Sequence, residues 1–191
     1  MSFTRPMLRN VHVVGGALAA ALLASGCAGA GPYDHAVTYV PLAGEDDAAK
    51  GARDFDPVLV QREREAWHRG TVSLFGVVVA RAPGPAGAAY LTLSVRRLEG
   101  RNVCEYATDE TTCRTTVSDS DFGVVHAVVA LRPEDDVGQH SVGTGSLLRL
   151  VGPLAQDPDP NDGTSVLRPT FYRHWPRYFF VTKAAAATMR Q

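Results

Sequence analysis

The chain has 191 residues, with 19 basic and 20 acidic side chains and a formal net charge of −1. This length suits a single domain with a core of its own. The charge balance leaves no basic excess to follow a phosphate backbone, so the composition argues against nucleic acid as a partner.

An export signal is predicted at the N-terminus. Residues 1–10 carry Arg5 and Arg9 and no acidic residue, and an apolar run from Val11 to Ala24 follows. That run is shorter than the about 20 residues that a membrane-spanning helix needs, and it has the length of a secretory signal. We therefore interpret residues 1–26 as a signal peptide.

A cysteine follows the small residues at the end of this signal. The segment Leu23-Ala24-Ser25-Gly26-Cys27 resembles the lipobox of bacterial lipoproteins. The resemblance implies cleavage before Cys27 and attachment to a membrane through acyl chains such as palmitate on that residue. Ala28 in place of aspartate favours the outer membrane, facing the periplasm. A plain secretory signal and a short N-terminal membrane anchor are the alternatives.

Residues 27–54 are predicted to be a flexible tether. They are rich in Gly, Ala, Pro and Asp, and their only apolar patch is Tyr39–Leu42. Such a composition lacks the large apolar side chains that a core needs. The alternative is that the patch docks on the domain or on a partner.

The domain, residues 55–182, is predicted to begin with a short helix and to continue as strands. Asp56 as N-cap and Pro57 at the first helical position start the helix, which runs to Arg69. Alternation and β-branched residues then predict five strands, over residues 71–81, 90–98, 122–131, 146–151 and 166–181. Residues 183–191 form a C-terminal tail, and Thr182, just before it, caps a short helix.

The order of these elements indicates the fold class. A hairpin comes first, and a short turn or helix separates the third strand from the fourth, which is the layout of an OB-fold barrel. We therefore predict a mainly β fold with a small five-stranded OB-like barrel. A small β-sandwich with the same number of strands is the alternative.

Cys104 and Cys113 lie in the polar loop between the second and third strands. With Cys27 consumed by lipid, they are an even pair outside the cytoplasm, where disulfides persist. We predict a structural disulfide that contributes about 2–3 kcal/mol by closing a short loop. A metal pair and a redox-active dithiol are alternatives, although the spacing is not Cys-x-x-Cys.

No metal site, cofactor or catalytic motif is predicted. The sequence has no Gly-x-Ser-x-Gly elbow, phosphate loop or His-Glu-x-x-His motif. His126 interrupts an otherwise apolar strand. A hydrogen-bonded histidine inside the barrel is the favoured interpretation, with a ligand or a general base as the alternative.

The segment Phe171–Phe180 is the richest candidate surface. Aromatic residues interleaved with arginines suit protein hot spots, and they also suit stacking on bases or sugars. Alternation places half of the aromatic side chains in the core and predicts that Arg173, Trp175 and Arg177 point outward. We take these three as candidate partner-binding residues.

The layout resembles that of the Slp-type outer-membrane lipoproteins and other periplasmic OB-fold proteins. The likeness is carried by Gly76–Val79, Gly145–Leu154 and Tyr172–Pro176, within residues 67–181. The chain departs from the pattern in its inserted cysteine loop and in lacking a Gly-Gly pair after Trp67. The resemblance implies an envelope location and a non-enzymatic role, with no catalytic residue to carry over.

These features together predict a lipid-anchored protein of the cell envelope. It would act as a non-enzymatic binding or structural module, with a protein or envelope component as its partner, no cofactor and no nucleic acid. The competing hypothesis is an enzyme or small-ligand carrier that uses a polar site near His126. Burial of both Trp175 and Arg177 would count against the partner site.

Overall fold

The structure is a computed structural model that describes residues 31–190, so the predicted signal peptide and Cys27 lie outside it. The strands are β1 (His35–Thr38), β2 (Arg53–Asp54), β3 (Thr71–Pro83), β4 (Ala89–Arg96), β5 (Arg101–Cys104), β6 (Thr115–Val117), β7 (Val124–Val129), β8 (Leu147–Pro153), β9 (Val166–Leu167), β10 (Phe171–Trp175) and β11 (Phe180–Thr182). The helices are α1 (Ala43–Ala49), α2 (Pro57–Arg62), α3 (Arg64–His68), α4 (Pro133–Asp136) and α5 (Lys183–Met189), with 3₁₀ turns at Pro85–Gly87 and Glu110–Thr112. None of the described helices is long and apolar enough to cross a membrane.

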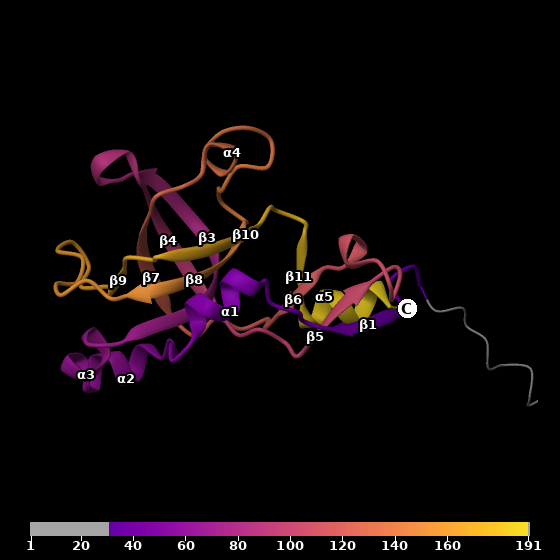
Figure 1. Cartoon of the computed structure of the whole chain (residues 1–191), viewed down its shortest axis with the longest axis horizontal. Helices are drawn as coiled ribbons and strands as arrows, with labels where there is room; N and C mark the ends of the chain where they lie inside the picture. The colour runs from indigo at the N-terminus through magenta and orange to yellow at the C-terminus, as the bar shows by residue number, and fades with distance from the viewer. Residues whose placement is uncertain (1–30, 191) are drawn as a thin grey trace, which may run out of the picture. The chain divides into compact units, whose positions relative to one another are not determined.

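The fold is mainly β, as predicted, and one curled sheet organises it (Figure 1). The strand order is β10–β8–β3–β4–β7–β9. β9 pairs in parallel with β7, and a bridge between Leu154 and Leu167 brings it against the end of β8 as well. The sheet therefore turns back on itself, as an OB-like fold requires. Its inner face holds the main core, which includes Val72, Leu74, Leu91, Leu93, Val125, Ala127, Leu148 and Leu150.

The main sheet has seven strands in the described chain, where five were predicted. β2 joins the edge of β3 in parallel. The predicted last strand is divided into β9, β10 and β11 because Pro169 and Pro176 lack a backbone N–H and restrict the residues before them. The predicted hairpin is present as β3 and β4, which pair from Phe75 opposite Arg96 to Pro83 opposite Ala89.

The helix predicted up to Arg69 is present as two short helices. Asp56 caps α2 as predicted, because its Oδ1 accepts hydrogen bonds from the amides of Val58 at 2.9 Å and Leu59 at 3.0 Å. The backbone leaves the helical region at Glu63, with φ −124° and ψ 40°, and α3 follows. Trp67 on α3 is buried in the main core.

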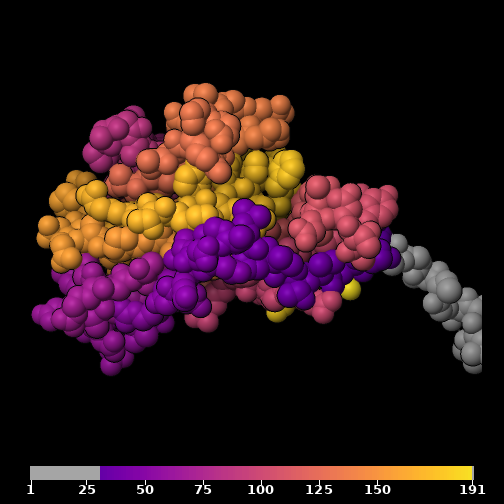
Figure 2. Space-filling view, in the orientation of Figure 1, coloured from indigo at the N-terminus to yellow at the C-terminus, as the bar shows by residue number. Residues whose placement is uncertain are grey.

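Residues 31–54 differ from the predicted flexible tether. They form β1, α1 and β2, and α1 packs against β8 and β10; Figure 2 shows this segment in indigo, running across the visible face of the molecule. The physical reason is Glu45, which is fully buried and forms ion pairs with Arg149 and Arg173. Two smaller sheets complete the fold, with β1 antiparallel to β5 and β11 parallel to β6. Thr182 caps α5, as predicted.

Candidate functional site

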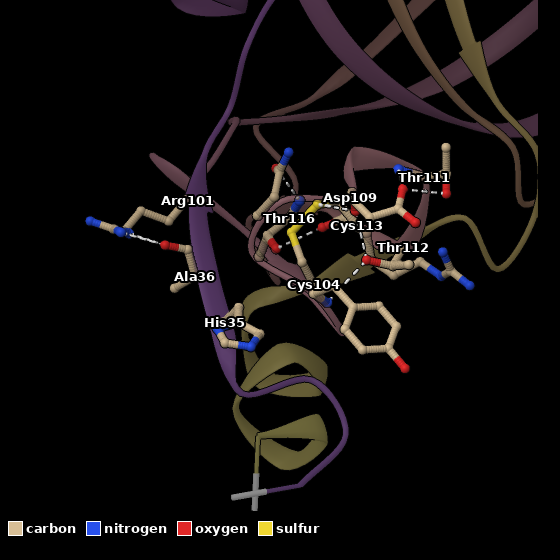
Figure 3. Close-up of a disulfide and its surroundings, with 12 residues drawn as sticks. His35, Ala36, Arg101, Cys104, Asp109, Thr111, Thr112, Cys113 and Thr116 are labelled. Atoms are coloured by element: carbon tan, nitrogen blue, oxygen red, sulfur yellow. Dashed lines mark hydrogen bonds between the residues drawn. A yellow bond between two sulfur atoms is a disulfide. The ribbon is translucent and has the colours of Figure 1, made fainter.

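Cys104 and Cys113 are joined by a disulfide. Figure 3 shows the bond between β5 and the turn at Glu110–Thr112, where Asp109 accepts hydrogen bonds from the amide and hydroxyl of Thr111. Cys104 is fully buried. Cysteines in a disulfide have no thiolate to bind a metal ion, so the bond has a structural role and closes the loop of residues 104–113.

The three predicted partner-binding residues do not form one exposed patch. Arg173 and Trp175 share a face of β10, as alternation requires, but this face is covered. Arg173 donates a hydrogen bond to Glu45 at 2.9 Å, and Trp175 is only 9 % exposed and packs against Tyr39. Arg177 alone is exposed. The predicted partner site therefore does not exist as an exposed surface, because the N-terminal segment covers the face of β10 that carries Arg173 and Trp175.

His126 is a hydrogen-bonded residue of the sheet. Its Nδ1 lies 3.1 Å from the hydroxyl of Thr92, and its Nε2 lies 2.9 Å from a carboxylate oxygen of Asp162. Hydrogen bonds from the amide of Thr164 and from His126 lower the pKa of Asp162 to about 2. Both ring nitrogens of His126 are engaged, which leaves neither free for a ligand.

A second histidine, His174, lies in a buried polar cluster that the sequence did not single out. Its Nδ1 is 2.8 Å from Asp135, and its Nε2 is 3.2 Å from the hydroxyl of Ser146. Asp135 also accepts a hydrogen bond from Tyr172 at 2.7 Å. A carboxylate, an imidazole and a hydroxyl linked in this order form the catalytic triad of many hydrolases. Ser146 is only 2 % exposed, however, so a substrate could not reach its hydroxyl. We therefore assign the cluster a structural role.

The strand register places three arginines in one row across the outer face of the sheet. Arg173 on β10 lies opposite Arg149 on β8, Arg149 lies opposite Phe75 on β3, and Phe75 lies opposite Arg96 on β4. Residues directly opposite each other in neighbouring strands share a face. Glu45 is bound by Arg173 and Arg149, and Arg96 forms the far end of the row.

A groove opens beside Arg96 because the edge of β3 changes partner there. β4 pairs with β3 only from Phe75 onward, whereas β2 occupies the same edge at Val72 and Ser73. β8 fills the other edge of β3 from Thr71 to Val77. The gap between β2 and the end of β4 forms a groove of about 540 Å³, a size typical of small-molecule sites.

The lining of the groove combines apolar surface with unpaired donors. Its apolar part includes Leu59, Phe55 and Phe122. Three buried nitrogens of lining residues have no hydrogen-bond acceptor in the described chain: Nε1 of Trp67 and Nε of Arg96 and Arg149. A buried donor without an acceptor lowers the stability of the fold by about 1–3 kcal/mol, so each of these nitrogens needs a physical explanation.

Charges of opposite sign line the two sides of the groove. Arg96 and Arg97 come from the β4 side, and the guanidinium of Arg97 lies 4.3 Å from the centre of the Phe122 ring. Asp46 on α1 and Asp54 on β2 come from the other side. The groove can therefore accept a ligand with hydrogen-bond acceptors, and it offers carboxylates opposite them.

The sequence did not indicate this groove. Arg96 and Arg97 are adjacent near the end of the predicted strand 90–98, and this pair of arginines was the one sequence feature that could have indicated a binding site there. Trp67 lies within the predicted helix, where its position carried no sign of a binding site. The groove depends on where β4 stops pairing with β3, and a single sequence carries no direct record of that register.

Comparison with known proteins does not assign the chain to a family. No protein-family model matches the chain, and no curated protein matches it. Structures of the protein PriB from Ralstonia solanacearum, at resolutions of 2.3 and 1.8 Å, align with it at a TM-score of 0.28. The identities are 15 % and 16 %, and the alignments cover 55 % of this chain and 97 % and 95 % of the PriB chains.

Two predictions disagree with this comparison, and a third gains no support from it. The chain was predicted to be a lipid-anchored, non-enzymatic envelope module and to have no nucleic-acid partner, yet the structures that it aligns with are of a single-stranded-DNA-binding protein. Both predictions are withdrawn as statements of function and partner, and the alternative site at His126 gains no support. Lipidation of Cys27, a residue outside the described range, is not tested by the comparison. The resemblance to Slp-type lipoproteins is not supported by the comparison. At this TM-score no ligand is carried over to the chain.

Proposed function

We propose that the groove between β2 and β4 binds a small ligand that joins an apolar group to an anionic group, without converting it. The observation that carries the proposal is the set of three donor nitrogens without acceptors, on Trp67, Arg96 and Arg149, around one apolar groove. Arginine and tryptophan side chains only donate hydrogen bonds, so their natural partner is an acceptor-rich group.

An anionic group suits these donors better than a neutral one. Hydrogen bonds between a guanidinium and a carboxylate or phosphate are roughly twice as strong as neutral ones. Arg97 adds an exposed guanidinium at the rim of the groove. The apolar part of the ligand would lie against Leu59 and Phe122, where burial contributes about 25 cal/mol per Å².

The donor nitrogens are covered by neighbouring side chains in the described chain. The guanidinium of Arg53, for example, lies 4.1 Å from the centre of the Trp67 ring. A ligand would therefore reach the donors after a small displacement of these side chains. Such rearrangements of rotamers are common when ligands bind.

Fluorescence of Trp67 tests the proposal directly. The chain has two tryptophans, so the variant Trp175→Phe leaves Trp67 as the only reporter. The probes are 3-phenylpropionate and its uncharged amide. We expect the carboxylate to change the emission of Trp67 saturably and to bind about tenfold more tightly than the amide.

Matched arginine variants locate the site. In the same background, Arg97→Ala should weaken 3-phenylpropionate about tenfold, because it removes a charged donor at the rim. Arg177→Ala removes an exposed arginine outside the groove lining and should leave binding unchanged. Equal affinity for the acid and the amide, or equal binding by both variants, would refute the proposal.

We propose single-stranded nucleic acid as a second candidate ligand, at a different surface. The loop between β10 and β11 exposes Tyr178 and Phe179, at 74 % and 40 %. The guanidinium of Arg177 lies 4.9 Å from the centre of the Tyr178 ring, and that of Arg114 lies 5.1 Å from the centre of the Phe179 ring. Exposed aromatic rings interleaved with arginines are the usual platform for stacking unpaired bases.

A labelled oligo(dT) tests this second candidate by fluorescence anisotropy. We expect binding that weakens as salt rises and that Tyr178→Ala reduces, because both stacking and phosphate contacts contribute. Tyr106→Ala, at another exposed tyrosine, should bind normally. Absence of binding at low salt would remove this candidate and would leave the groove proposal as it stands.

A further inference from the structure

We infer that the ligand of the groove is a zwitterion, with a cationic group that contacts Asp46 and Asp54 while its anionic group contacts the arginine side. This inference rests on the proposed function and names its substrate class. An apolar α-amino acid, or the end of a short peptide, has the required combination of groups.

The register of β3 sets the spacing of the two charged sides. Asp54 lies opposite Ser73, and Arg96 lies opposite Phe75, on the same edge of the strand. These positions are two residues apart, about 7 Å along the strand. Ser73 and Phe75 point to the same face, so the cross-strand neighbours Asp54 and Arg96 share that face as well. A small dipolar ligand can span this separation with an opposite charge at each end.

The carboxylates of the groove differ in what they already bind. Asp56 is occupied, because its carboxylate caps α2. Asp46 and Asp54 are exposed, and neither takes part in an ion pair among residues 31–190. They are therefore the two acceptors on this side that are available to a cationic group.

The buried donors of the same groove indicate that its acidic side faces a ligand site. Trp67 is 3 % exposed, lines the same groove and has no acceptor for its Nε1. Arg149, whose side chain is 14 % exposed, is held in place by Glu45 through one terminal nitrogen while its Nε has no acceptor. A ligand with only a cationic group would leave these donors unpaired, and one with only an anionic group would leave both aspartates unused.

Three related probes separate the charges. Phenylalanine carries both groups, 3-phenylpropionate lacks the ammonium, and phenethylamine lacks the carboxylate. Each is titrated against the Trp175→Phe protein with Trp67 fluorescence as the readout. We expect phenylalanine to bind at least about tenfold more tightly than either partial probe, the gain of one charge-assisted contact.

Neutral variants of the aspartates identify the contact with the ammonium group. Asp54→Asn and Asp46→Asn should each reduce the preference for phenylalanine over 3-phenylpropionate without changing the affinity for 3-phenylpropionate. Asp47→Asn is the matched control, since Asp47 is exposed on α1 but does not line the groove. It should retain the full preference.

The outcomes distinguish this inference from the proposed function. If phenylalanine and 3-phenylpropionate bind equally, the zwitterion is refuted and the anion-binding groove stands. If the aspartate variants keep the full preference, the assignment of the cationic contact is wrong. If none of the three probes binds, the inference and the proposed function both fail.

Discussion

Glu45 accepts a hydrogen bond from Arg149, a residue 104 positions further along the chain. It also accepts hydrogen bonds from Arg173 at 2.9 Å and from the amide of Leu42 at 3.1 Å. Burial alone would raise the pKa of Glu45, but hydrogen bonds from Tyr39 and Arg149 hold it below its ordinary value. The carboxylate is therefore ionised at neutral pH, and it fixes α1 on the outer face of the sheet.

Removing this carboxylate should destabilise the fold strongly. Glu45→Ala would leave Arg149 and Arg173 without their partner, and breaking a buried ion pair in this way costs about 3–5 kcal/mol. Urea denaturation measures the loss. Asp46→Ala is the control, because its side chain is the exposed neighbour on the same helix. A Glu45→Ala variant as stable as that control would show that α1 is not held by this contact.

Local signals in the sequence accounted for much of the fold. Alternation predicted the pairing of β3 with β4, and the cap at Asp56 was correct, because each depends on residues close in sequence. The row from Arg173 to Arg96 was not predicted, since it depends on the register of four strands. The docking of α1 was not predicted for a similar reason. An acidic residue such as Glu45 is expected to lie in solvent, and only its distant partners Arg149 and Arg173 explain its burial.

The polar cluster around His174 should make stability depend on pH. Burial is the main cause that lowers the pKa of His174 below 6.5, and the neighbouring Asp135 opposes this shift. Between the lowered folded pKa and 6.5, the unfolded chain binds more protons than the folded chain. Stability should therefore fall as the pH drops through this range. Thermal unfolding midpoints between about pH 5 and 8 measure the effect.

Substitution assigns this pH dependence to one residue. His174→Gln cannot gain a proton, so its unfolding midpoint should vary less over this range than that of the parent chain. Arg132 and His140 are the other charged or titratable groups that act on His174, and both remain in the variant. His35→Gln, at a histidine whose side chain is 43 % exposed, should keep the parent slope. The assignment to His174 fails if both variants retain the same slope.

The disulfide should contribute measurable stability. Cys104 and Cys113 are nine positions apart, and closing a ring of this size contributes about 2–3 kcal/mol in the chain-entropy model. The double variant Cys104→Ser/Cys113→Ser should therefore unfold at lower urea concentration. Adding a reductant should lower the stability of the parent chain and leave the variant unchanged. A parent chain indifferent to reductant would contradict a stabilising role.

Gly152 should be intolerant of any side chain. A Cβ there would lie 2.5 Å from the carbonyl oxygen of Arg168 and 2.6 Å from Cα of Pro169, both backbone atoms. Gly152→Ala must therefore move β8 away from the β9–β10 connection, at a cost of about 1–3 kcal/mol. Gly100→Ala is the control, since a Cβ there meets nothing within 4 Å. Equal urea midpoints for the two variants would contradict the close approach that curls the sheet.

Lipidation of Cys27 is a prediction that depends on the sequence alone. Acyl chains on this residue would contribute about 0.8 kcal/mol per buried methylene, so several chains give a stable anchor. Expressed in a bacterium with a lipoprotein pathway, the parent chain should incorporate labelled palmitate and enter the detergent phase of a Triton X-114 separation. Cys27→Ser should lose both properties, whereas Cys104→Ser should keep them. Label in the Cys27→Ser protein, or a parent chain that stays in the aqueous phase, would show that the segment is an ordinary export signal or a protein anchor instead.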